Sequence, residues 1–193
     1  MKVGIFGGSF NPPHIAHKKI AEILLKGKFL DKIVYVPTGN KYTKPLLIPA
    51  EHRYNMLKLF IENNKHLEVS DFEIKKSLVY TYETLDYFQK KYKNDEIYFI
   101  LGTDNLRQIN TWKNADYLLR NYKFLVIKRN DDNIDKMLSS LGKYQENVIP
   151  FDFSQDVSST AIRNLIRNDM DVSNFIDKKV LEYIKAYNLY ENE

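Results

Sequence analysis

The sequence predicts an α/β protein with an open, doubly wound parallel sheet and a small helical part near the C-terminal end. Short runs that are almost wholly apolar or aromatic, such as residues 97–101, are typical of strands buried on both faces of a parallel sheet. Segments of helical period lie between these runs, and repeated strand–helix–strand units favour a doubly wound sheet. After about Pro150 the pattern changes to helices with no strand after them.

Six segments are expected to form the strands, because each is a short apolar run bounded by polar or turn residues. They are Lys2–Phe6, Lys32–Val36, Leu67–Ser70, Glu96–Leu101, Tyr122–Ile127 and Asn147–Pro150. Ligands of such sheets bind beyond the carboxyl ends of the strands. The loops of interest therefore begin at Gly7, Pro37, Gly102 and Lys128.

Three helices are expected between the strands, because apolar residues recur there on one helical face. The three faces consist of Ala16, Ile20, Ile23 and Leu24; of Tyr54, Leu57, Phe60 and Ile61; and of Thr81, Leu85, Phe88 and Tyr92.

Two further helices are expected at Ser158–Asn168 and Asp177–Tyr187. The hydroxyl residues 158–160 offer an N-cap for the first, and Asp177 offers one for the second. A length of 193 residues suits one domain. We expect a single domain over 1–193, with a helical subregion over about 151–193.

Composition excludes several classes of protein. The chain has no cysteine, so disulfides and thiolate metal sites are absent, and no apolar run is long enough for a membrane span. The first residues are expected to form a buried strand rather than a signal peptide, which predicts a cytoplasmic protein without a membrane partner. The formal charge of +4 is spread along the chain without a basic run, so no nucleic-acid partner is expected and small anionic substrates suit the charge better.

The loop after the first expected strand carries the strongest chemical signal. Gly7 and Gly8 let backbone N–H groups approach a phosphate, and the N-terminus of the following helix adds unsatisfied donors. His14 and His17 are three residues apart, so both project to the same side of the first helical turn. A dinucleotide site is disfavoured because the spacing is not G-x-G-x-x-G. A zinc site is disfavoured because no third ligand lies nearby in the sequence.

These residues, Gly7-Gly8-Ser9-Phe10-Asn11-Pro12 through His14-Ile15-Ala16-His17, resemble the signature of the nucleotidyltransferase superfamily, which ends in H-x-G-H. Ala16 replaces the usual glycine. The resemblance implies a Rossmann-like nucleotidyltransferase fold. Class I aminoacyl-tRNA synthetases share a related motif, and residues 136–140 are a superficial match to their second motif. That segment is explained more simply as the end of an amphipathic helix, and the chain is too short for a synthetase.

A second motif narrows the family. Residues 157–163, Val-Ser-Ser-Thr-Ala-Ile-Arg, resemble the I-S-S-T-x-I-R motif of nicotinate-nucleotide adenylyltransferases. Hydroxyl groups at a helix start can donate to phosphate oxygens, and Arg163 can chelate a phosphate through two nitrogens. The alternative is an ordinary N-cap followed by a solvated arginine.

Other segments are similar to the same family along essentially the whole chain. Residues 79–85 resemble S-Y-T-x-[DE]-T-L with Val79 in place of Ser, and residues 51–57 resemble a helix that we interpret as structural. Asp104 lies two residues after Gly102, at the end of the most apolar strand. Its carboxylate can accept hydrogen bonds from ribose hydroxyls. Alternatively, Asp104 can cap a helix. Trp112 is alternatively a core residue and Lys44 alternatively a solvated loop charge.

The resemblance implies a role for each matched residue. Catalytic roles are implied for His14, His17, Lys44 and Arg163. ATP binding is implied for Gly7, Gly8, Ser9, Phe10, Gly102, Asp104, Ser158, Ser159 and Thr160. Substrate binding is implied for Asn11, Thr81, Tyr82 and Trp112, with Trp112 stacked on a pyridine ring.

The implied reaction transfers the adenylyl group of ATP to nicotinate mononucleotide and releases pyrophosphate, a step of NAD biosynthesis. Mg²⁺ is expected as the cofactor, held by phosphates and water rather than by protein ligands. The alternatives are transfer to nicotinamide mononucleotide or phosphopantetheine, or a non-catalytic regulator that binds ATP or NAD. The sequence leaves open the preference for the acid or the amide of the pyridine substrate. It also leaves the oligomeric state open, with a homodimer among the alternatives.

Overall fold

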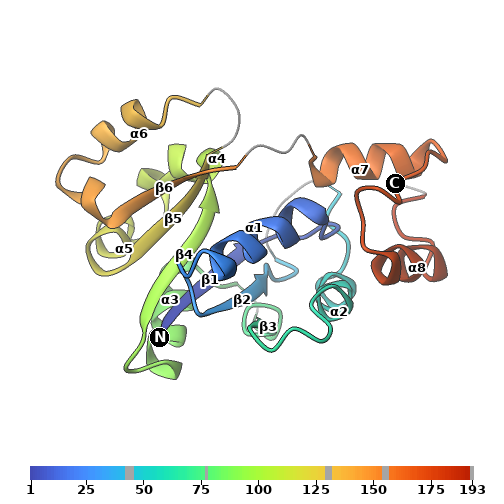
Figure 1. The fold of residues 1–193 in the computed structure, drawn as a ribbon, viewed down its shortest axis with the longest axis horizontal. Helices are drawn as coiled ribbons and strands as arrows, with labels where there is room; N and C mark the ends of the chain where they lie inside the picture. Colours follow the sequence, from blue (N-terminus) through green and yellow to red (C-terminus); the bar gives the residue numbers. More distant parts are fainter. Residues whose placement is uncertain (42–45, 77, 129–131, 154–156, 192–193) are drawn as a thin grey trace.

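The computed structural model describes residues 1–193 except 42–45, 77, 129–131, 154–156 and 192–193. A six-stranded, wholly parallel sheet with the order β3-β2-β1-β4-β5-β6 forms its centre (Figure 1). The strands are β1 (Lys2–Gly8), β2 (Lys32–Pro37), β3 (Leu67–Val69), β4 (Glu96–Gly102), β5 (Lys123–Lys128) and β6 (Val148–Asp152). The order reverses direction between β1 and β4, which creates a topological switch point at their carboxyl ends.

Helices connect the strands and follow the last one. They are α1 (Ile15–Lys26), α2 (Ala50–Phe60), α3 (Thr81–Lys91), α4 (Thr103–Arg107), α5 (Ala115–Asn121), α6 (Ile134–Ser140), α7 (Ser159–Arg167) and α8 (Lys178–Ala186). Two 3₁₀ turns, η1 (Ile109–Thr111) and η2 (Gly142–Asn147), complete the elements of the described residues. None of the helices in the described ranges is long and apolar enough to cross a membrane.

Two apolar layers bury the two faces of the sheet, because successive side chains of a strand point to opposite faces. Phe6 of β1 and Ile100 of β4 belong to one layer, which also contains residues of α1, α2, α7 and α8. Ile5 and Phe99 belong to the other layer, which contains residues of α3, α4, α5 and α6.

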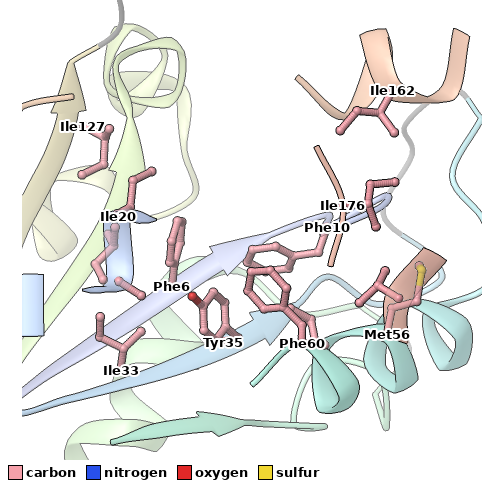
Figure 2. Packing of buried hydrophobic residues seen from close by; sticks show 14 of the residues in the cluster. Phe6, Phe10, Ile20, Ile33, Tyr35, Met56, Phe60, Ile127, Ile162 and Ile176 are labelled. Atoms are coloured by element: carbon pink, nitrogen blue, oxygen red, sulfur yellow. The ribbon is translucent and has the colours of Figure 1, made fainter. Parts of the chain in front are cut away.

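The two C-terminal helices pack on the same face as α1 and α2. α8 lies beside α2, with α7 above it in the view of Figure 1, and Ile162 and Ile176 contribute to the first layer (Figure 2). The backbone N–H of Ile15 donates to the carbonyl of Phe175 at 2.9 Å, and the Lys18 ammonium lies 3.1 Å from an Asp177 oxygen. These contacts join the end of the chain to the start of α1.

The predicted fold class is confirmed. Each expected strand is observed, and its first and last residues agree with the observed bounds to within two positions. The two C-terminal helices are also confirmed: Ser158 caps α7 by accepting from the N–H of Ala161, and Asp177 caps α8 by accepting from Lys179. The assignment of Ile23 to the buried face of α1 is wrong. Its side chain is 41% exposed, and Ala21 is buried instead, because the face covered by the sheet is rotated toward residues 20, 21 and 24.

A cluster of charged side chains at the edge of the sheet holds the short outer strand β3 in place. The Glu68 carboxylate of β3 lies 2.7 Å from Nζ of Lys32 and 2.6 Å from Nζ of Lys91. It also accepts a hydrogen bond from the Tyr92 hydroxyl at 3.0 Å. Partial burial raises the pKa of Glu68, but the hydrogen bonds from Lys32 and Lys91 outweigh burial and hold the pKa at about 2. The ionised carboxylate therefore ties β3 to both β2 and α3.

The variant Glu68→Gln should destabilise the fold by about 1 kcal/mol at neutral pH, the scale of a partly exposed charge cluster. Because the folded-state pKa lies below the ordinary value of 4.5, the wild-type carboxylate stabilises the fold above about pH 4.5 and loses this contribution as the pH falls toward 2. Urea unfolding at neutral pH and at about pH 3.5 should show a difference between the two proteins that shrinks in acid. The exposed Glu146→Gln is the control, and a pH-independent difference for Glu68→Gln would contradict this account.

Candidate active site

A cavity of about 370 Å³ opens at the carboxyl ends of β1 and β4, where the strand order reverses. Its walls come from the β1–α1 loop, the start of α4 and the start of α7. Many residues predicted for catalysis or ATP binding line it together: Gly7, Gly8, Ser9, Phe10, His14, His17, Gly102, Asp104, Ser158, Ser159, Thr160 and Arg163. Residues from three separate parts of the sequence thus form one site.

The turn after β1 is tightly constrained. A Cβ added to Gly7 would lie 2.9 Å from the Phe99 ring, so only glycine fits there without displacing that ring. Phe10 has a φ of 47°, in the left-handed region, and its side chain is buried against the rings of Phe6 and Tyr35 at 5.6 and 5.5 Å (Figure 2). The ring packing holds a backbone conformation that bulky residues rarely adopt.

The two predicted histidines lie together and face the cavity. Their ring centroids are 3.9 Å apart, and both rings line the wall, as the three-residue spacing predicts. His14 is the N-cap residue of α1, and its backbone N–H donates to Nδ1 of His17 at 3.1 Å. Since Nδ1 of His17 accepts this bond, the neutral ring carries its proton on Nε2, which makes Nε2 a hydrogen-bond donor.

The start of α7 closes one side of the cavity. The Ser159 hydroxyl donates to the carbonyl of Pro12 at 3.0 Å, and Arg163 donates through Nη1 to the carbonyl of Asn11 at 2.8 Å. Nη2 of Arg163 donates to the Thr160 hydroxyl at 3.2 Å. The alternative of a solvated arginine is wrong, because Arg163 is only 6% exposed. Arg163 therefore braces the loop and also lines the cavity.

Residues after β4 supply a carboxylate. Gly102 is the N-cap of α4, so the alternative that Asp104 caps this helix is wrong. Asp104 lies in the first turn, with its side chain 69% exposed, and lines the cavity beside Asn105. Sequence reasoning missed Asn105, although its place directly after Asp104 in the same helical turn was a signal.

Asn11 is buried in a network of its own. Its Nδ2 donates to the carbonyl of Leu46 at 2.6 Å, and its Oδ1 accepts from the Tyr190 hydroxyl at 3.0 Å and the N–H of Ile48 at 3.5 Å. The side chain is 2% exposed, and it is not among the described residues that line the cavity. The structure thus gives Asn11 a bracing role, and its substrate-binding role stays a prediction.

Three of the four residues predicted for substrate binding lie on the opposite face of the sheet from the histidines. Trp112 packs edge-on to Phe99, with centroids 6.1 Å apart, and Tyr82 packs on the same layer. Thr81 is the first residue of α3 and is partly exposed. These three residues do not line the cavity, but the Phe99 ring that packs against Trp112 also lies against Gly7 in the turn after β1. The predicted Lys44 falls outside the described residues.

In the described part of the chain, no three His, Cys, Asp or Glu side chains gather where they could hold a metal ion. The groups that line the cavity are suited to anions: backbone amides at a glycine turn, two imidazoles, four hydroxyls and one guanidinium. The site can therefore hold a phosphorylated ligand and stabilise negative charge as it moves.

Comparisons with known proteins agree with this geometry. A family model described as Cytidylyltransferase-like matches residues 5–165. The chain belongs to this family. A probable nicotinate-nucleotide adenylyltransferase of Clostridium tetani is 39% identical over 197 residues, covering 98% of this chain and 98% of the relative. One of Caldicellulosiruptor bescii is also 39% identical, covering 99% of this chain and all of the relative.

A solved structure supports the fold of this family member. The nicotinic acid mononucleotide adenylyltransferase of Plasmodium falciparum, complexed with NaAD, superposes with a TM-score of 0.82. It covers 100% of this chain and 98% of its own, at 23% sequence identity. The family resemblance predicted from the two motifs is therefore confirmed, and so is the fold that it implied.

The tautomer of His17 is a direct test of the site geometry. In ¹H–¹⁵N spectra of the neutral ring, we expect Nδ1 of His17 to be unprotonated and Nε2 to carry the proton, because the His14 N–H occupies Nδ1. The chain has four histidines, so His17→Ala assigns the signal by its loss. A protonated Nδ1 in the neutral ring would show that the His14–His17 contact does not form in solution.

Proposed function

We propose that this protein transfers the adenylyl group of ATP to nicotinate mononucleotide, producing the deamido form of NAD and pyrophosphate. The observation that carries the proposal is the cavity in which the glycine turn, the histidine pair and the start of α7 meet at the switch point. The relatives named as probable nicotinate-nucleotide adenylyltransferases, which align over almost their full length, support the choice of reaction.

The transfer is a single in-line displacement. A phosphate oxygen of the mononucleotide attacks the α-phosphorus of ATP and forms a new P–O–P bond. The bond between the α-phosphorus and the oxygen bridging it to the β-phosphate breaks, and that oxygen leaves with pyrophosphate. No protein side chain needs to become covalently attached, so positioning and charge stabilisation account for the catalysis.

Different residues of the cavity are proposed to bind different phosphates of the reacting molecules. We assign Nε2–H of His17 to the α-phosphate, because its tautomer presents a donor there. His14 and the N–H groups of the glycine turn would bind neighbouring phosphates, and Arg163 with the hydroxyls of α7 would hold the pyrophosphate as it forms. Lys44 is proposed to join them on the basis of its family match alone.

Mg²⁺ fits this site as a companion of the triphosphate. Among the described residues of the cavity wall, Asp104 alone carries a carboxylate, so phosphate oxygens and water would supply most of the ligands. Bound in this way, the ion would neutralise charge on the phosphates.

The pyridine mononucleotide is proposed to bind on the other side of Phe99. Trp112 and Tyr82 supply aromatic surface there, and the backbone at the start of α3 supplies N–H donors for a carboxylate. A ligand spanning the carboxyl ends of β1 and β4 would bring its phosphate to the histidine pair. This arrangement matches an acceptor that has a ring at one end and a phosphate at the other.

The substrate is tested by measuring pyrophosphate release with ATP, Mg²⁺ and one of three acceptors. Nicotinate mononucleotide should be used with the highest kcat/KM, ahead of nicotinamide mononucleotide and phosphopantetheine. A preference for either of the other two would replace the proposed substrate. Absence of release with all three would favour the non-catalytic regulator that binds ATP or NAD.

Replacement of His17 tests its assignment. His17→Ala should lower kcat by about a hundredfold or more, the scale of losing one key charge-stabilising donor. The exposed His66→Ala, far from the cavity wall, is the matched control and should leave kcat unchanged. A folded His17→Ala protein with nearly wild-type kcat would remove His17 from the mechanism.

A further inference from the structure

Arg53 is a buried charge that the proposed chemistry does not use. It belongs to α2, and its side chain is fully buried. A guanidinium taken out of water is strongly destabilising unless its N–H groups find acceptors. The partners it finds therefore indicate why an arginine is accommodated there.

The guanidinium of Arg53 joins three separate parts of the backbone. Nη1 donates to the carbonyl of Ser9 at 2.9 Å and to the hydroxyl of Thr38 at 3.2 Å, and Nη2 donates to the carbonyl of Thr38 at 2.6 Å. Nε donates to the carbonyl of Ile48 at 3.0 Å. Because the guanidinium is a rigid planar fork, these bonds fix the loop after β1, the end of β2 and the start of α2 relative to one another.

The bond to Ser9 acts directly on the turn of residues 7–10, which we call the phosphate turn because the proposed function assigns it to phosphate binding. The Ser9–Phe10 peptide is trans and planar, so its C=O and N–H point in opposite directions. With the carbonyl directed at Arg53 of α2, the Phe10 N–H is directed away from Arg53, and Phe10 itself lines the cavity. A carbonyl that accepts from a charged donor also polarises its peptide group, which makes that N–H a stronger donor.

The turn needs a restraint of this kind. The positive φ of Phe10 is unfavourable for a residue with a large side chain, so the surroundings must hold it. Ring contacts with Phe6 and Tyr35 hold the side chain, but they do not fix the orientation of the preceding peptide. The bond between Arg53 and Ser9 fixes that orientation.

We propose that Arg53 is a positioning residue, which aims the Phe10 N–H and the rest of the phosphate turn at the triphosphate during adenylyl transfer. This inference rests on the proposed function. Arg53 is not among the described residues of the cavity wall, so it acts through the Ser9–Phe10 peptide rather than by touching ATP.

Charge alone does not account for this role. Burial lowers the pKa of Arg53 to about 10, so the side chain keeps its charge at neutral pH. A lysine at this position would also be charged, but one ammonium group cannot span Ser9, Thr38 and Ile48 with a planar fork. Arg53→Lys therefore separates geometry from charge.

Steady-state kinetics of Arg53→Lys test the proposal. We expect kcat to fall about tenfold or more, because misplaced donors stabilise the transferring phosphate poorly, while KM for the pyridine mononucleotide stays within about twofold. Met56→Val is the matched control: it also loosens the buried face of α2 but leaves the Ser9 contact in place, so its kcat should be that of wild type. Equal kcat for Arg53→Lys and wild type, both folded by circular dichroism, would overturn the proposal.

A measurement on the wild-type protein tests it independently of turnover. Adding α,β-methylene-ATP, a non-hydrolysable analogue, should shift the ¹H–¹⁵N signal of the Phe10 amide strongly, and the shift should be much smaller in Arg53→Lys. A silent Phe10 amide in the analogue-bound wild-type protein overturns the proposal, and this titration decides the matter if Arg53→Lys does not fold. Failure of the wild-type enzyme to use any acceptor would count against the proposed function, while the titration would still test the role of Arg53.

Discussion

The site depends on holding one backbone turn in a conformation that the chain would not keep without help. Residues 7–10 line the cavity at the end of β1, and Phe10 takes up a left-handed backbone there. Rings from β1, β2 and α1 enclose its side chain, and the buried Arg53 holds the peptide before it. The strain in the turn is thus offset by packing that belongs to the core.

The sheet topology explains why two different ligands can meet at this turn. Because the strand order reverses beside β1, the helices after β1 and β2 cover one face, and the helices before and after β4 cover the other. The histidine pair lies on the first side, and the aromatic residues around Trp112 lie on the second. The loops after β1 and β4 lead to helices on opposite faces, so the carboxyl ends of these two strands are where ligands from the two sides could meet.

Sequence alone predicted the strands and the anion-binding turn because both signals are local. Apolar runs and the spacing of His14 and His17 need no knowledge of distant contacts. The exposure of Ile23 could not be derived in this way, because the orientation of α1 on the sheet depends on its neighbours. Arg53 escaped functional interpretation because its acceptors are mostly backbone carbonyls of residues remote in sequence, such as Ser9, which leave no trace in residue type.

The hydrogen bonds of Asn11 have a consequence for how the molecule matures. Its carbonyl is bound by Arg163 and its carboxamide by Tyr190, so this loop is completed by residues 152 and 179 positions further along the chain. Contacts between such distant parts of a chain form late, since a long segment must be ordered before they close. The neighbouring strands can therefore pair while the pocket beside them is still incomplete, and the pocket closes only when Arg163 and Tyr190 reach the loop.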